Sequence, residues 1–357
     1  MTSTYLRPTA FVDAPFGHDG KVARLAGGLV WFSAVELIRE GAEPELVPVA
    51  GIERRLGDLP QEARSAWERI VAPRPPLRLG GRGIPLDQPR IVGILNVTPD
   101  SFSDGGRYEN AGAAVAAGAA MAEAGAAVID VGGESTRPGA KPVWEGDEIA
   151  RVGPVVERLA AAGHAVSIDS RKAAVMEAAL AAGAALVNDV SALTWDDRAA
   201  ETVASAGVPV VLMHHRGTPE TMQQAPRYDR PVALAVHDWL EERIEAAMAA
   251  GIDRERIIVD PGIGFGKTLA HNLALLNNLS LFHGLGCPLM LGASRKRMIG
   301  ALSHEASVDE RLPGSLALAL KGAGQGAQLL RVHDVPETVQ ALRVWRGLRD
   351  AALSPSV

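Results

Sequence analysis

The feature of this sequence that most limits its possible folds is a repeat that begins near residue 90. Short apolar runs recur there, and each is followed by a polar residue or loop and then by a segment of helical length. This pattern is typical of parallel strands that are joined by crossover helices. The expected strands lie at 91–95, 127–131, 165–168, 185–187, 209–213, 256–259, 288–291 and 328–332.

Expected helices fill the intervals between these strands and end the chain. They lie at 111–124, 148–162, 172–182, 198–206, 231–250, 272–282, 313–325 and 337–348. Eight strand–helix units in roughly 260 residues match the usual size of a (β/α)8 TIM barrel. We therefore predict an α/β fold of this type. A doubly wound open sheet is the alternative, because periodicity does not show whether a sheet closes.

The first 90 residues lack this repeat. We expect residues 1–72 to form a small α/β or irregular N-terminal extension. Within it we expect a strand at 28–32, a short helix at 34–39 capped by Ser33, and a helix at 61–71. Residues 73–89 contain five Pro and three Gly, which predicts a linker or irregular arm. The barrel then occupies 90–350, and 351–357 form a C-terminal tail.

Composition disfavours several classes of protein. The net charge of -6 argues against a general nucleic-acid-binding protein. The single Cys287 cannot form an intramolecular disulfide and fits a reducing compartment. The first ten residues lack the parts of a signal peptide, and the Ala/Gly-rich segment 111–128 is too weakly hydrophobic for a membrane span. We therefore expect a cytoplasmic protein that binds neither nucleic acid nor a membrane.

Polar side chains gather at the C-terminal ends of the expected strands. In a parallel barrel these ends meet at one rim, where barrel enzymes hold their active sites. A single buried Asp could cap the next helix instead, but a whole series of such positions favours a functional site. The series consists of Asn96, Asp130, Asp169, Asn188, Asp189, His214, Asp260, Ser294, Lys296, Arg331 and His333.

Part of this series suggests a site for phosphate. Arg331 and His333 lie two residues apart on the last expected strand, so their side chains point to the same face. Together with Lys296 they could hold a phosphate or diphosphate, and the alternative is a solvated strand end. Asn96 offers a neutral oxygen that suits a Mg2+ ion held otherwise by water and substrate phosphate.

Other strand-end residues suit a flat nitrogen heterocycle. Asp169, Asn188 and Asp260 carry short donors and acceptors that can read the edge of such a ring. Buried polar recognition of this kind discriminates strongly, because a mismatched ligand leaves polar groups unpaired. Met213 could form the floor of the pocket, although a Met at such a position is more often part of the core.

Three polar or glycine-rich loops follow the strands. The loops at 96–106 and 133–139 are long, which is typical of functional loops that cover a ligand. The segment 260–268 ends in Gly-Lys-Thr like a phosphate-binding P-loop, but Pro261 stands where that motif needs a Gly. We interpret this segment as a turn that lets a flat ligand approach the backbone, with Phe265 as a stacking or wall residue.

Five segments together resemble the signature blocks of dihydropteroate synthases, in the order and spacing of that family. They are 96–106, 133–139, 260–267, 292–296 and 331–335. The resemblance covers residues 90–350 and implies a (β/α)8 barrel. It also implies a transferase of folate biosynthesis and a target of sulfonamides. Such an enzyme joins 6-hydroxymethyl-7,8-dihydropterin diphosphate to 4-aminobenzoate and releases diphosphate.

The resemblance implies roles for individual residues. Asn96 would bind Mg2+, the expected cofactor, and the resemblance does not choose between Asp100 and Asp104 as a second contributor. We also expect a homodimer. Residues implied to act in catalysis are Asn96, Asp169, Lys296, Arg331 and His333. Residues implied to bind the pterin diphosphate or 4-aminobenzoate are Thr136, Arg137, Asp169, Asn188, Met213, Asp260, Phe265, Ser294, Lys296, Arg331, Val332 and His333.

Two other functions remain open from the sequence. A pterin-binding methyltransferase barrel would share the ring contacts, but it should lack the diphosphate pair and the loop that holds Thr136 and Arg137. A non-catalytic pterin-binding or scaffold protein would not need an intact rim. In that case the N-terminal extension, which has no counterpart in the minimal family pattern, would matter more.

Overall fold

The structure is a computed structural model, and it describes residues 3–98, 107–134, 142–217, 222 and 225–353. Eight parallel strands form its main sheet. They are β7 (Arg90–Asn96), β8 (Val128–Gly132), β9 (Val166–Asp169), β10 (Leu186–Asp189), β11 (Val210–Met213), β12 (Ile257–Asp260), β13 (Met290–Leu291) and β14 (Leu329–Val332). The strand order is β12-β11-β10-β9-β8-β7-β14-β13. A parallel bridge from Val259 to Leu289 joins the two ends of this order, so the sheet closes and the predicted barrel is confirmed.

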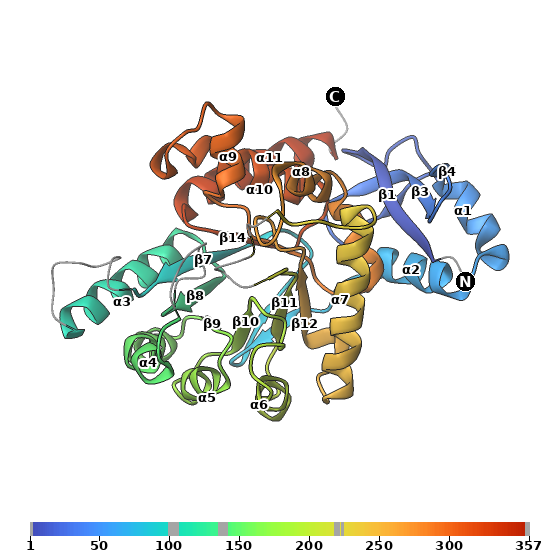
Figure 1. Cartoon of the computed structure of the whole chain (residues 1–357). Helices are drawn as coiled ribbons and strands as arrows, with labels where there is room; N and C mark the ends of the chain where they lie inside the picture. The colour runs from blue at the N-terminus through green and yellow to red at the C-terminus, as the bar shows by residue number, and fades with distance from the viewer. Residues whose placement is uncertain (1–2, 99–106, 135–141, 218–221, 223–224, 354–357) are drawn as a thin grey trace.

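Helices surround the barrel in the intervals where the sequence predicts them (Figure 1). They are α3 (Arg107–Ala124), α4 (Glu145–Ala161), α5 (Ala173–Ala181), α6 (Ala199–Ala206), α7 (Val232–Ala249), α8 (Leu269–Asn277), α10 (Leu312–Gly324) and α11 (Val335–Ala352). The helix expected at 272–282 is divided into two parts. Helix α8 ends at Asn277, and the 3-10 segment η4 (Leu279–Leu285) follows it. The short helix α9 (Arg297–Leu302) is additional, and α11 extends two residues into the expected tail. Among the described residues, no helix is long and apolar enough to cross a membrane.

Alternation along the strands separates two layers of apolar side chains. Successive strand residues point to opposite faces, so steps of two residues keep a side chain on one face. Residues such as Ile91, Val131 and Leu212 pack with the surrounding helices in the largest buried cluster. The opposite face points into the barrel and forms its floor. The floor residues are Val92, Val128, Ala165, Leu186, Val211, Ile258, Met290 and Leu329.

A β-hairpin covers this floor and closes the N-terminal end of the barrel. It consists of the antiparallel strands β5 (Leu77–Leu79) and β6 (Arg82–Ile84). Leu77, Leu79 and Ile84 are buried in one cluster with the floor residues. The interpretation of 73–89 as a linker or irregular arm is therefore wrong over this hairpin. The alternating apolar side chains of the hairpin are buried against the barrel floor. This burial outweighs the tendency of the Pro residues on either side to favour irregular structure.

The N-terminal extension is an ordered α/β unit with its own core. It consists of β1 (Thr4–Val12), β2 (Ala23–Arg24), β3 (Trp31–Arg39), β4 (Glu45–Pro48), α1 (Val49–Arg55), η1 (Leu56–Asp58) and α2 (Gln61–Val71). The strands form an antiparallel sheet in which β3 pairs with each of the others. Helix α2 has the bounds that the sequence predicts. The core between sheet and helices includes Phe32, Val35 and Trp67.

The short helix expected at 34–39 is wrong, and the expected strand at 28–32 begins only at Trp31. Residues 31–39 form one continuous strand that pairs with β1 over its whole length. Ser33 caps no helix, because its hydroxyl donates to the carbonyl of Ala10 at 3.0 Å. Pairing and burial across the sheet therefore outweigh a local capping signal, as is common for weak local preferences.

The extension is bonded to the helix layer of the barrel. Tyr5 Oη donates to Asp238 Oδ2 on α7 at 2.8 Å, and Arg230 Nη2 donates to Tyr5 Oη at 2.6 Å. On the other side, Arg349 Nη2 of α11 donates to the carbonyl of Leu29 at 2.6 Å. Figure 1 shows the extension beside the barrel, next to α7 and near the end of α11.

Removing apolar volume from the hairpin should destabilise the whole protein. Leu79 is 1% exposed against the barrel floor. Leu79→Ala should lower the free energy of unfolding by about 2–4 kcal/mol, because it leaves a cavity. Arg78→Ala, on the exposed face of the same strand, should change it by less than about 0.5 kcal/mol. Denaturant unfolding measures both, and equal small effects would show that the hairpin is a dispensable arm.

Candidate active site at the C-terminal rim of the barrel

The barrel strands direct the predicted site residues into one place. Each stands two or four residues beyond an inward-pointing floor residue of its own strand, so its side chain points to the barrel axis near the C-terminal rim. This applies to Asn96, Asp169, Asn188, Met213, Asp260, Arg331 and His333, and also to Asp130, for which the sequence suggested no role. These residues therefore share one rim, whereas Asp189 and His214 of the predicted series directly follow the inward-pointing Asn188 and Met213 and point to the other face.

Arg331 joins three of these strands. Its Nε donates to Asp130 Oδ2 at 2.6 Å, and its Nη2 donates to Asp169 Oδ2 at 2.5 Å. The same Asp130 oxygen accepts a hydrogen bond from Asn188 Nδ2 at 2.9 Å. Asp130 is 1% exposed, and its other oxygen has no hydrogen-bond partner in the structure. Asp130 thus holds the guanidinium and the amide that the sequence assigned to different parts of the ligand.

The sequence places Asp130 in the rim series, and it also contains a signal for a role as the partner of a charged group that we did not use. A carboxylate between Ile129 and Val131 in a buried strand must be paired, because a buried unpaired charge is costly. Its inward parity marks it as a rim residue in the same way as Asp169. What the sequence does not contain is its partner, since Arg331 follows it by 201 residues.

The charges at the centre of the rim do not cancel. One guanidinium faces two carboxylates, Asp130 and Asp169, within hydrogen-bond distance. Burial raises the pKa of Asp169 to about 7; Arg331 opposes this effect and Asp130 adds to it. Burial works against the charge of Arg331, but the two carboxylates raise its pKa overall. Arg331 therefore stays cationic, and burial, with a smaller contribution from Asp130, makes Asp169 a weak acid.

A second group of site residues lies where β13 and β14 end. Ser294 Oγ is 3.0 Å from His333 Nδ1 and also accepts a hydrogen bond from the His333 amide at 3.2 Å. Burial and the neighbouring Arg331 lower the pKa of His333 to about 4, so its imidazole is neutral near pH 7. Lys296 Nζ lies 4.0 Å from the centre of the Phe265 ring, in a cation–π contact.

The glycine-rich loop after β12 is folded around a buried lysine. Lys267 is 2% exposed, and its Nζ lies 2.8 Å from His214 Nδ1 and 2.9 Å from the carbonyl of Gly262. Burial lowers its pKa well below the ordinary value. A Cβ added at Gly262 would lie 1.8 Å from the His214 carbonyl, and the φ of Gly262 is +67°. The lysine of the Gly-Lys-Thr sequence therefore points into its own loop and does not bind an external phosphate.

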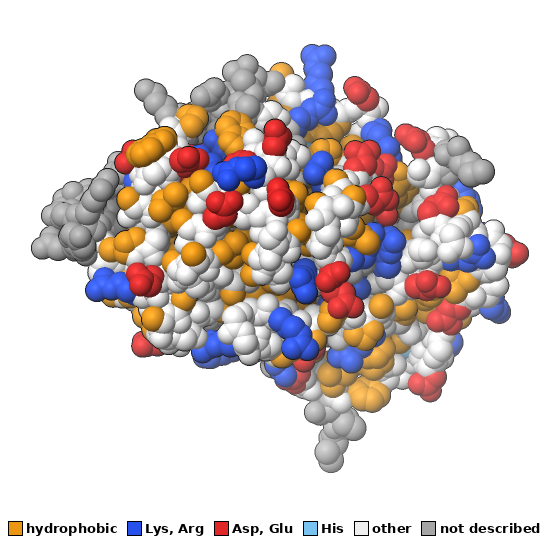
Figure 2. All heavy atoms as spheres, turned by 90° about the horizontal axis from the view of Figure 1, so that it is seen from below, with side chains coloured by type: hydrophobic (Ala, Val, Ile, Leu, Met, Phe, Trp, Pro, Cys, Tyr) orange, Lys and Arg blue, Asp and Glu red, His pale blue; other side chains and the backbone are white. Residues whose placement is uncertain are grey.

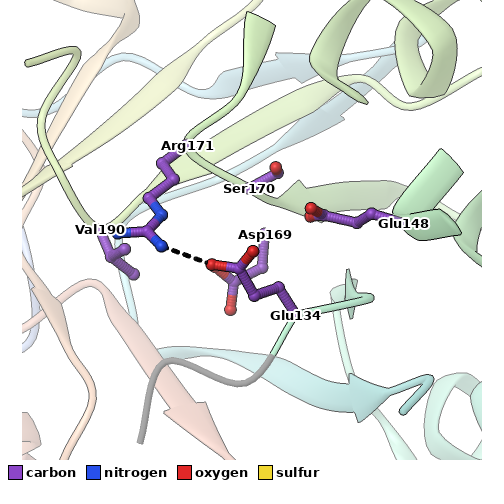
Figure 3. Close-up of a pocket in the computed structure, with 6 residues that line it drawn as sticks. All are labelled: Glu134, Glu148, Asp169, Ser170, Arg171 and Val190. Carbon is purple, nitrogen blue, oxygen red and sulfur yellow. Dashed lines mark hydrogen bonds and ion pairs between the residues drawn. The ribbon is translucent and has the colours of Figure 1, made fainter. Parts of the chain in front are cut away.

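A smaller charged cluster adjoins Asp169 (Figure 3). Arg171 Nη2 pairs with Glu134 Oε1 at 2.7 Å, and Lys172 Nζ pairs with Glu148 Oε2 at 2.6 Å and also with Glu134. Figure 3 shows Arg171 and Glu134 facing each other across a pocket beside Asp169. The pocket encloses about 10 Å3, which is room for no more than a water molecule. The ion pairs around it hold the start of α4 against the segments that follow β8 and β9.

Some predicted residues do not join the rim. Val332 lies between Arg331 and His333, so its side chain points the other way and is buried in the cluster shared with the helices. A ligand contact through the Val332 side chain is therefore wrong. Thr136, Arg137, Asp100 and Asp104 lie outside the described residues.

Asn96 is the residue at the rim that suits a metal ion. It ends β7 with a half-buried amide. Within the described ranges, no group of three or more His, Cys, Asp or Glu side chains is arranged to hold a metal. The donors present fit an ion of the Mg2+ type, which keeps several waters and takes its other ligands from a phosphorylated substrate.

Asp169 should make stability depend on pH. Its folded pKa of about 7 exceeds the ordinary value of 3.8, so its contribution to stability is present at low pH and is lost as the pH rises through 7. Asp169→Asn lacks this contribution. Between about pH 5.5 and about pH 8, the unfolding free energy of the wild type relative to the variant should fall by about 2 kcal/mol. Denaturant unfolding at both values tests this, and a constant difference would exclude the raised pKa.

Comparison with known proteins agrees with this geometry. A family model described as a pterin binding enzyme matches residues 92–333, and the extension lies outside it. The dihydropteroate synthase of Escherichia coli (strain K12) is 48% identical over 265 residues, which is 74% of this chain and 93% of that protein.

Solved structures show the same relation. The dihydropteroate synthase of Xanthomonas albilineans with 4-aminobenzoic acid aligns with a TM-score of 0.73 and 50% identity, over 77% of this chain and 98% of that one. The enzyme of the same organism in complex with 7,8-dihydropteroate aligns with a TM-score of 0.70 and 48% identity, over 77% and 99%. The chain therefore belongs to the dihydropteroate synthase family of pterin-binding enzymes.

Proposed function

We propose that the rim joins 6-hydroxymethyl-7,8-dihydropterin diphosphate to 4-aminobenzoate and releases diphosphate, a transferase step in folate biosynthesis. The observation that carries this proposal is that Asp169 and Asn188, which are proposed to read the heterocycle, lie in one hydrogen-bonded network with the cationic Arg331. The family membership and the ligands named for the Xanthomonas albilineans structures support the same reaction.

The pterin ring is proposed to lie across the barrel mouth. Asp169, Asn188 and Asp260 would read its ring N–H, amino and carbonyl groups. Asp260 is already oriented, since its Oδ1 accepts a hydrogen bond from the Gly262 amide at 2.7 Å. Met213 is buried beneath the mouth, and the Phe265 ring with Lys296 would border it. A polar edge on one side and apolar walls elsewhere suit a flat ring that carries several donors.

The diphosphate is proposed to bind where β13 and β14 end. Arg331 would offer its fixed guanidinium, and His333 and Ser294 would add donors from the adjacent strand ends. As the bond between the pterin methylene carbon and the leaving oxygen breaks, negative charge grows on diphosphate. Donors that are already held in place stabilise such charge without reorganising. Asp130 accepts a hydrogen bond from Arg331 Nε and is proposed to position the guanidinium for the diphosphate.

Mg2+ is proposed to bind next to this site with Asn96 as a protein ligand. Its chemistry when bound would be the neutralisation of charge on the diphosphate. The aromatic amine needs no dedicated base, because neutral 4-aminobenzoate is already a nucleophile. Its nitrogen forms the new C–N bond and then loses a proton. As the family resemblance implies, Thr136, Arg137 and Ser294 are proposed to bind the pterin diphosphate and 4-aminobenzoate.

Two further proposals concern the whole molecule. A homodimer is supported by Val344 and Leu348, which are 62% and 70% exposed one turn apart on α11. The mass in solution tests it, and a strictly monomeric mass at micromolar concentration would exclude it. A cytoplasmic location is supported by Cys287, which is buried and has no second cysteine to pair with.

The reaction is tested by release of diphosphate from the pterin diphosphate in the presence of 4-aminobenzoate and Mg2+. The expected result is turnover that needs both substrates. Tight pterin binding without turnover would favour a binding or scaffold protein. Methyl transfer from a methylated folate to an acceptor would favour the hypothesis of a pterin-binding methyltransferase. Omission of Mg2+, with a chelator present, should reduce turnover at least tenfold if the ion acts on the leaving group.

Arg331 should matter more for the diphosphate than for the ring. Arg331→Gln removes the charge but keeps hydrogen-bonding atoms. It should weaken binding of the pterin diphosphate at least tenfold more than binding of the bare hydroxymethylpterin. Isothermal titration of both ligands measures the difference, and circular dichroism confirms folding. His333→Ala leaves the ion pairs of Arg331 with Asp130 and Asp169 intact. It should also weaken binding of the pterin diphosphate more than binding of the bare hydroxymethylpterin. Equal losses for both ligands in both variants would refute the assignment.

A further inference from the structure

The strand that carries Ser294 and Lys296 is weakly held by the sheet. β13 contains two residues, and its pairing with β14 ends at Leu291 and Leu330. On its other side, one bridge from Leu289 to Val259 connects it to β12. The pairing between β13 and β14 therefore stops three residues before Ser294 and three residues before His333. Another interaction must set the 3.0 Å contact between these two side chains.

The backbone at Arg295 has an unusual conformation. Its φ is +57°, in the left-handed region, which is unfavourable for a residue with a Cβ. Arg295 lies between Ser294 and Lys296, which turn toward His333 and the Phe265 ring respectively. A non-glycine residue keeps such a conformation when the surrounding structure enforces it, and such residues often mark functional positions.

The guanidinium, the backbone amide and the carbonyl of Arg295 each have a partner, and together these contacts hold this conformation. Its guanidinium forms two hydrogen bonds with the Asp334 carboxylate, one from Nε at 3.0 Å and one from Nη2. Its backbone amide donates to Ser315 Oγ at 2.9 Å. Its carbonyl accepts from Arg311 Nη1 at 3.1 Å. Bidentate pairs of this kind combine charge with a defined geometry.

The ion pair connects the two strand ends directly. Arg295 is the neighbour of Ser294, and Asp334 is the neighbour of His333. Both side chains of the pair are largely buried, with 35% and 11% exposed. The pair therefore bridges β13 and β14 beyond the last sheet hydrogen bond, at the level of the site residues. It also occupies the Asp334 carboxylate, which would otherwise repel an anionic ligand at His333.

We propose that Arg295 and Asp334 are a positioning pair for the diphosphate site. Their ion pair maintains the left-handed turn at Arg295 and thereby sets Ser294 against His333 and Lys296 against Phe265. Neither residue needs to touch the substrate. The role rests on the proposed function of this rim, and it adds residues that act through their neighbours.

Asp334→Asn is the first test, because it keeps the size of the side chain and removes the charge. The KM for the pterin diphosphate should rise about tenfold in the intact enzyme, while the melting temperature falls by only a few degrees. The control is Glu337→Gln, which removes an exposed negative charge on the same helix α11 and should leave KM within twofold. A folded Asp334→Asn variant with an unchanged KM, or an equal rise in Glu337→Gln, would overturn the proposal.

Two variants of Arg295 separate the turn from the ion pair. Arg295→Gly adopts positive φ without strain but loses the pair, so its KM should rise as in Asp334→Asn. The exchange Arg295→Asp with Asp334→Arg restores a pair of opposite charges, and Asp tolerates the left-handed region. The exchange should lower KM at least part of the way back to the wild-type value. Failure of the exchange, with an unaffected Arg295→Gly variant, would show that the pair has no positioning role.

The same measurements distinguish the two proposals. If the wild-type chain shows no turnover of the pterin diphosphate and does not bind it, the proposed function fails and the pair is not implicated. If the wild type turns over normally and the variants change only the melting temperature, the function stands and the positioning pair fails. Should Asp334→Asn not fold, Arg295→Lys keeps the charge and loses only the bidentate geometry. It is expected to raise KM severalfold.

Discussion

The ion pairs of Arg331 with Asp130 and Asp169 are the interaction on which the site depends. They join β8, β9 and β14, which are three of the four consecutive strands β9-β8-β7-β14 of the barrel. Removing the guanidinium would leave two buried carboxylates without a counter-ion, which is far more costly than removing an exposed pair. Burial raises the pKa of Asp169 against the opposing effect of Arg331, whereas the two carboxylates keep Arg331 charged. The ion pairs that join these strands are therefore formed by residues of the candidate active site.

The barrel is supported unevenly around this network. Strands β7 to β12 pair over three or more residues with at least one neighbour, whereas β13 pairs with β14 at two positions. Side chains complete the closure on this side, through Arg295 with Asp334 and Ser294 with His333. At the other end of the barrel, Leu77 and Leu79 of the hairpin cover the floor. The barrel is therefore packed against the hairpin at its N-terminal end, and side-chain contacts join β13 and β14 at its C-terminal end.

Much of this could be predicted from the sequence. The eight strands follow from apolar runs, and the inward direction of Asn96, Asp260 and Arg331 follows from steps of two residues along a strand. The errors arose where local signals compete with distant contacts. Ser33 looks like a helix cap, yet residues 31–39 pair with β1. The Pro-rich segment 73–89 looks like a linker, yet its Leu and Ile side chains cover the barrel floor. A local pattern contains no information about a partner that comes from elsewhere in the chain.

By itself the sequence determined the eight strands, the polar residues at their ends and the types of group that they carry, because strand periodicity and residue chemistry are local properties. The family resemblance came from the same local blocks. Tertiary structure alone decided which groups pair. It placed Asp130 behind Arg331, turned Lys267 into its own loop and set Arg295 against Asp334. Those choices depend on distances between residues that are far apart in the chain, and only the closed barrel brings them within bonding range.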